Sequence, residues 1–129
     1  MAETKSVLIA DDDDGYRFPI VCLFEDAGYT VFEATSQNGI MEHARNHRPQ
    51  VWVIDVRLPT GKLEGIQAVE ELLAEGVSCN RVFFISVIPQ STTDPKVLEV
   101  LASIGKRVRY EWIEKPFELD FLLDRVSQE

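Results

Sequence analysis

The sequence of 129 residues has few cysteines, few basic residues and no long apolar run. Its two cysteines, Cys22 and Cys79, form no Cys-x-x-Cys pair, so neither a disulfide nor a thiolate metal site is expected. Only 13 basic residues stand against 22 acidic ones, and the net charge of −9 disfavours direct binding to nucleic acid or an anionic membrane. No apolar segment suits a signal peptide or a membrane span, so we expect a cytoplasmic protein.

The length and composition are those of one globular domain. Apolar residues make up 45% of the chain and charged residues 27%, which excludes a disordered or fibrous protein. A chain of this length buries enough surface to fold unaided. We therefore expect a single domain over residues 1–129, with its core at about residues 6–127.

Short apolar runs alternate with segments of helical periodicity along the chain. Strands are expected at 7–10, 30–34, 51–55, 81–87 and 109–113. Helices are expected at 16–27, with Pro19 in the first turn, at 36–47, from 66 to about 76, at 95–105 and at 119–126. This alternation predicts an α/β fold with a parallel sheet covered by helices on both faces. We expect a doubly wound five-stranded sheet of the flavodoxin-like order 2-1-3-4-5.

Reactive side chains stand where four of these strands end. Asp11 and Asp12 follow the first strand, Asp55 ends the third, Ser86 lies at the end of the fourth and Lys115 follows the fifth. The first, third and fourth strands are neighbours in the predicted order, so these groups should converge at one edge of the sheet. Three close carboxylates repel one another unless a cation lies between them, and hard oxygen ligands suit Mg²⁺.

This set of groups has the chemistry needed for phosphoryl transfer to an aspartate. Metal ion, hydroxyl and ammonium together can meet the charge on the transferred group. The predicted roles are direct metal ligand for Asp12, water-mediated ligand for Asp11, ligand and phosphoryl acceptor for Asp55, hydrogen-bond donor for Ser86 and counter-charge for Lys115.

On these residues the chain resembles a receiver domain of the two-component response regulators over essentially its whole length. The matching residues are the acidic pair Asp11-Asp12, the Asp-x-x-x-Pro segment from Asp55 to Pro59, the hydroxyl of Ser86, and Lys115-Pro116.

The resemblance implies a signalling switch and the classes of protein that it would interact with. The phosphoryl group would come from a phosphohistidine of a sensor histidine kinase or a histidine phosphotransfer protein, with Mg²⁺ as cofactor. The domain would catalyse only its own phosphorylation and dephosphorylation. A face built from the fourth helix, fifth strand and fifth helix would act on a downstream protein or output domain, and could support a homodimer. The resemblance also implies a cis bond before Pro116.

Three residues near the site depart from the family pattern or extend it. Val87 replaces the usual small residue after the switch hydroxyl and should narrow access to the phosphoryl group. Trp112 stands where a Tyr or Phe commonly swings inward on phosphorylation, and it is either such a switch or a strand aromatic packed on the surface. Arg57 would offer its backbone carbonyl to the metal ion.

Two other functions compete with the phosphorylated receiver. One is a receiver-like protein-binding module that is never phosphorylated. The other is a phosphatase resembling the haloacid dehalogenases, because the segment from Ile9 to Gly15 resembles their Asp-x-Asp-Gly loop, with Asp12 as nucleophile and Asp14 as acid. The phosphorylated residue separates them, since a receiver is labelled on Asp55 and a phosphatase on Asp12.

Overall fold

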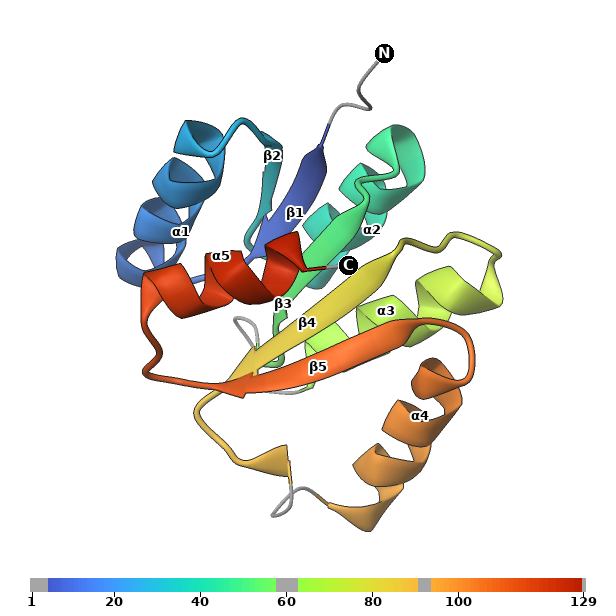
Figure 1. Ribbon diagram of the computed structural model, residues 1–129. Helices are drawn as coiled ribbons and strands as arrows, with labels where there is room; N and C mark the ends of the chain where they lie inside the picture. The colour runs from blue at the N-terminus through green and yellow to red at the C-terminus, as the bar shows by residue number, and fades with distance from the viewer. Residues whose placement is uncertain (1–4, 58–62, 91–93, 129) are drawn as a thin grey trace.

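The computed structural model describes residues 5–57, 63–90 and 94–128. Strands and helices alternate along these residues, and the five strands form one parallel sheet of order β2-β1-β3-β4-β5, which confirms the predicted fold (Figure 1). The elements are β1 (Ser6–Ala10), α1 (Asp14–Asp26), β2 (Thr30–Ala34), α2 (Gln37–His47), β3 (Val51–Asp55), α3 (Glu64–Ala74), β4 (Arg81–Ser86), α4 (Pro95–Gly105), β5 (Arg109–Glu114) and α5 (Leu119–Ser127).

Short polar side chains set the starts of three helices. Asp13 accepts a hydrogen bond from the backbone of Gly15 before α1, and Ser36 and Asp94 cap α2 and α4 in the same way. Because Asp13 is the cap, α1 begins at Asp14, two residues before the predicted start. Pro19 is therefore the sixth residue of α1, inside the helix, and not in its first turn as predicted.

The core lies on both faces of the sheet, because every residue of β3 and β4 is buried. Helices α2, α3 and α4 cover one face, where Trp52 and Phe84 are fully buried. Helices α1 and α5 cover the other, where Phe24 and Phe83 are fully buried (Figure 1). Each such side chain contributes about 1.5–3 kcal/mol of burial free energy, so the sheet is a rigid support for the groups at its edge.

A membrane-spanning helix is absent from the part of the chain that the structure describes, since none of its helices combines the necessary length and apolar character.

Candidate functional site

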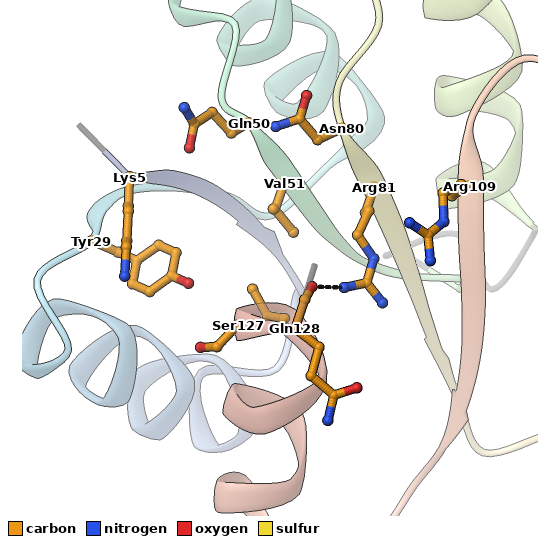
Figure 2. A pocket seen from close by; sticks show the side chains of 10 residues that line it. Lys5, Tyr29, Gln50, Val51, Asn80, Arg81, Arg109, Ser127 and Gln128 are labelled. Atoms are coloured by element: carbon orange, nitrogen blue, oxygen red, sulfur yellow. Dashed lines mark hydrogen bonds between the residues drawn. The ribbon is translucent and has the colours of Figure 1, made fainter. Parts of the chain in front are cut away.

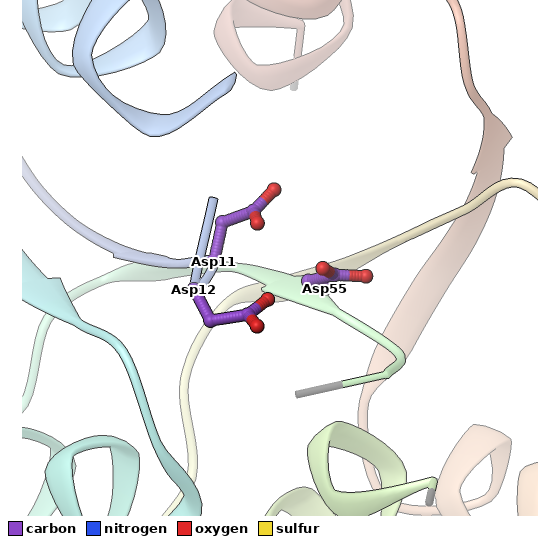
Figure 3. A group of neighbouring side chains, drawn as sticks. All are labelled: Asp11, Asp12 and Asp55. Atoms are coloured by element: carbon purple, nitrogen blue, oxygen red, sulfur yellow. The ribbon is translucent and has the colours of Figure 1, made fainter. Parts of the chain in front are cut away.

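Three carboxylates meet at the carboxyl edge of the sheet (Figure 3). Strands β1 and β3 are paired with Ala10 opposite Ile54, so the residues that follow, Asp11 and Asp55, come side by side. Asp12 joins them from the turn after β1, and one oxygen of each of the three carboxylates lies within 4.8 Å of the others. Asp11 is 3% exposed and Asp55 8%, whereas Asp12 faces solvent. All three predicted acids are thus brought together.

The turn that carries Asp11 is held from several sides. The backbone N–H of Asp13 donates to the Asp11 carboxylate at 2.9 Å, and Arg17 donates to the Asp11 carbonyl oxygen at 2.8 Å. Arg17 is itself buried and also binds Glu33 and Asp14. This arginine, which the sequence reasoning did not single out, fixes the first turn of α1 against the end of β1.

A glycine allows the start of α3 to approach Asp55. The N–H of Gly65 donates to the carbonyl oxygen of Val56 at 3.1 Å. A Cβ atom at position 65 would lie 2.1 Å from the backbone oxygen of Asp55, so only glycine fits there without displacing β3. The backbone N–H of Arg57 donates to the Asp55 carboxylate at 3.3 Å. The predicted role of the Arg57 carbonyl as a metal ligand stays a prediction, and Pro59 lies outside the described residues.

Lys115 reaches the acids from the end of β5. Its backbone N–H donates to the carbonyl oxygen of Ser86 at 2.7 Å, and the Lys115–Pro116 peptide bond is cis. Its Nζ atom lies 3.0 Å from an oxygen of Asp11 and 3.5 Å from an oxygen of Asp55. The side chain is only 7% exposed, so this ammonium is a buried counter-charge to two buried carboxylates.

One lysine does not neutralise the whole acidic group. Burial and the negative charge of Asp11 raise the pKa of Asp55 to about 7, against the opposing attraction of Lys115. For Lys115 itself, burial lowers the pKa, but the hydrogen bond to Asp11 and the charge of Asp55 outweigh it and the net pKa is raised. Three hard oxygen donors with one side open to water fit a divalent cation such as Mg²⁺.

Ser86 and Trp112 are joined through the backbone of one residue. Ser86 is buried at the end of β4, where its hydroxyl oxygen accepts the N–H of Ile88 at 3.0 Å. The indole N–H of Trp112 donates to the carbonyl oxygen of the same Ile88 at 2.9 Å. A cavity of about 120 Å³ adjoins all three residues. Val87 between them is 67% exposed, and its predicted effect on access stays a prediction.

A larger cavity, of about 580 Å³, lies where the strands begin, at the end of the sheet away from the acids (Figure 2). Arg81 lines it, but this guanidinium already donates to the backbone oxygens of Arg125 and Gln128, at 2.9 and 2.5 Å, and pairs with Glu111. Arg81 therefore ties α5 to β4 and β5, and the reactive groups remain at the opposite edge.

Comparisons with known proteins agree on one family. The family model of the response regulator receiver domain matches residues 7–127. The nitrogen assimilation regulatory protein NtrX of Azorhizobium caulinodans is 25% identical over 117 residues, which are 91% of this chain but 24% of that protein. Sporulation initiation phosphotransferase F of Bacillus subtilis is 23% identical over 124 residues, 96% of this chain and 92% of that protein.

A solved structure agrees with these sequence relatives. The receiver domain of the Francisella response regulator 1452 superposes with a TM-score of 0.76 at 26% identity, covering 95% of this chain and 93% of that one. The chain therefore matches nearly the whole of one short relative but only about a quarter of a long one.

Proposed function

The chain belongs to the response regulator receiver domain family, and on that premise we propose that Asp55 accepts a phosphoryl group in a Mg²⁺-dependent reaction. The donor is a phosphohistidine on a sensor histidine kinase or on a histidine phosphotransfer protein. The observation that carries the proposal is the convergence of Asp11, Asp12 and Asp55 within 4.8 Å, with the Lys115 ammonium against two of them.

In the proposed reaction an Asp55 carboxylate oxygen attacks phosphorus, a P–O bond forms and the P–N bond to the donor histidine breaks. The electron pair of that bond stays on the histidine nitrogen. Asp12 would hold the metal ion directly, Asp11 would hold it through water, and the Arg57 carbonyl would be a further ligand. Bound Mg²⁺ supplies positive charge to the phosphoryl oxygens. Lys115 pairs with one of these oxygens.

Ser86 and Trp112 are the proposed switch. When the phosphoryl group draws the Ser86 hydroxyl toward it, Ile88 loses the partner of its N–H. The shift of Ile88 then weakens the hydrogen bond that its carbonyl oxygen accepts from Trp112. In this proposal the two hydrogen bonds of Ile88 transmit the signal from the phosphorylation site to Trp112 on β5.

The proposed output surface is the face of α4, β5 and α5. Three large apolar side chains are exposed there, Leu98 on α4 and Leu119 and Phe121 on α5. Their burial against a protein partner would be favourable. We propose that this face binds a downstream protein or an output domain, and that a homodimer would use the same surface. Residues 1–129 act as one domain in this scheme, which operates in the cytoplasm and modifies no separate substrate.

Mapping of the phosphorylated residue tests the proposal. The protein is incubated with acetyl phosphate and Mg²⁺, the acyl phosphate is trapped by borohydride reduction, and peptides are mapped by mass spectrometry. Label on Asp55, lost in Asp55→Asn and kept in the exposed control Asp26→Asn, supports the receiver. Label on Asp12 would support the phosphatase alternative. No label from this donor or from phosphohistidine donors would leave the binding module as the better interpretation.

A further inference from the structure

An aromatic ring contacts the lysine of the site. Tyr16 is the third residue of α1, and the Nζ atom of Lys115 lies 4.2 Å from the centre of its ring. The same nitrogen contacts Asp11 at 3.0 Å and Asp55 at 3.5 Å. This distance is well within the range of a cation–π interaction, and the interaction strengthens when the cation is shielded from water, as Lys115 is.

We propose that Tyr16 is a positioning residue that holds the Lys115 ammonium in place by a cation–π contact while the carboxylates around it change partners. The inference rests on the proposed function, since it concerns what happens to Lys115 during phosphorylation. Tyr16 itself touches neither the acids nor the incoming group in this scheme. It acts through the lysine.

The neighbours of Lys115 differ in whether they keep their charge. In the proposed reaction the Asp55 carboxylate becomes an acyl phosphate and loses its own negative charge, and Asp11 would share its charge with a bound cation. Both ion pairs of Lys115 therefore weaken at the moment when its ammonium must meet a phosphoryl oxygen. The Tyr16 ring is neutral and is not a metal ligand, so its attraction for the ammonium does not change. Of the three contacts of the Lys115 ammonium, with Asp11, Asp55 and Tyr16, only the one with Tyr16 keeps its strength.

The ring is held in place by the first turn of α1. The backbone N–H of Tyr16 donates to the carbonyl oxygen of Asp13 at 3.1 Å, and Asp13 also caps the helix. The next residue, Arg17, is buried and binds both the Asp11 carbonyl and the Glu33 carboxylate. Because this turn is anchored, the Tyr16 ring can fix the position of the flexible Lys115 side chain.

Substitutions at position 16 separate the cation–π contact from simple packing. Tyr16→Phe keeps the face of the ring and removes only the hydroxyl. Tyr16→Leu keeps apolar cover but removes the ring. Phe18→Leu is the control for loss of a ring that does not contact Lys115, because it removes an exposed aromatic two residues along the same helix, whose ring lies 5.0 Å from the Arg17 guanidinium. A phenylalanine analogue with several ring fluorines at position 16 keeps the shape and weakens the negative face, so it tests the idea even if the leucine variant folds poorly.

The probe is beryllofluoride, an unreactive phosphoryl mimic, titrated calorimetrically into protein saturated with Mg²⁺. We expect the association constant to fall about two- to thirtyfold in Tyr16→Leu and in the fluorinated variant. Tyr16→Phe and Phe18→Leu should stay within about twofold of the parent. Equal binding by all variants would overturn the inference, as would an equal loss in Tyr16→Phe and Tyr16→Leu.

A second measurement needs no ligand. The ring current of Tyr16 should shift the Lys115 side-chain methylene resonances upfield in the metal-free protein. The shift should persist in Tyr16→Phe and vanish in Tyr16→Leu, and its absence from the parent would refute the contact. Failure of the parent to bind beryllofluoride would instead count against the proposed function. If the parent and Tyr16→Leu bind beryllofluoride equally well, the positioning role of Tyr16 is refuted and the proposed function is unaffected.

Discussion

Replacing the central carboxylate by an amide should stabilise the metal-free protein at alkaline pH. Burial and the charge of Asp11 raise the pKa of Asp55 from 3.8 to about 7 in the folded protein. A carboxyl group whose pKa is raised on folding favours the folded state fully below its unfolded pKa, here about pH 4, and that contribution is lost as the pH rises through about 7. Asp55→Asn removes the charge whose burial is unfavourable.

The size of the effect follows from the two pKa values. Each pKa unit corresponds to about 1.4 kcal/mol, so the rise from 3.8 to about 7 lowers the free energy of unfolding by about 4 kcal/mol at pH 8. At pH 5 the carboxyl is protonated in the folded protein, and the same linkage gives only about 2 kcal/mol. Asp55→Asn should therefore gain up to about 4 kcal/mol at pH 8, and its advantage should shrink by about 2 kcal/mol at pH 5.

Urea unfolding with a chelator present, followed by circular dichroism at pH 8 and pH 5, measures both quantities. Asp26→Asn is the matched control, because Asp26 is exposed at the end of α1 and its replacement changes the net charge by the same amount. The reasoning is refuted if Asp55→Asn is no more stable than Asp26→Asn at pH 8. An advantage of equal size at both pH values would refute it as well.

Three further outcomes are expected. Mg²⁺ at about 100 times its dissociation constant should stabilise the parent by about 2.7 kcal/mol, and Asp12→Asn should lose most of this gain in a thermal melt; an unchanged gain would exclude Asp12 as a ligand. Gly65→Ala should destabilise the fold by about 1–3 kcal/mol and weaken Mg²⁺ binding, because the added Cβ atom meets the Asp55 carbonyl oxygen. Gly105→Ala is the control, since its Cβ atom meets only a tyrosine ring. Similar urea midpoints for the two variants would contradict this prediction. In a Trp52→Phe background, beryllofluoride with Mg²⁺ should change the emission of Trp112 as its hydrogen bond to the backbone is released; constant emission under saturating mimic would argue against the switch.

The sequence by itself determined the alternation of strands and helices and the edge of the sheet at which the acids meet. The run from Val51 to Asp55 is apolar up to one carboxylate, as expected of a strand buried on both faces. Parallel strands all present their carboxyl ends at one edge. Because the expected order 2-1-3-4-5 makes the first and third strands neighbours, Asp11 and Asp55 were predicted to lie together although 44 positions separate them.

Only the tertiary structure decided how the side chains around those acids contact one another. The spacing of residues in the sequence does not predict three of these contacts. They are the contact of Tyr16 with Lys115, the two hydrogen bonds of Ile88 and the close approach of Gly65 to β3. They depend on the rotation of α1 and α3 about their axes and on side-chain rotamers, which packing fixes after the chain has folded. The alternation of buried strands and amphipathic helices is a pattern that the sequence carries, but contacts at ångström distances follow from the fit of neighbouring elements, which no single segment encodes.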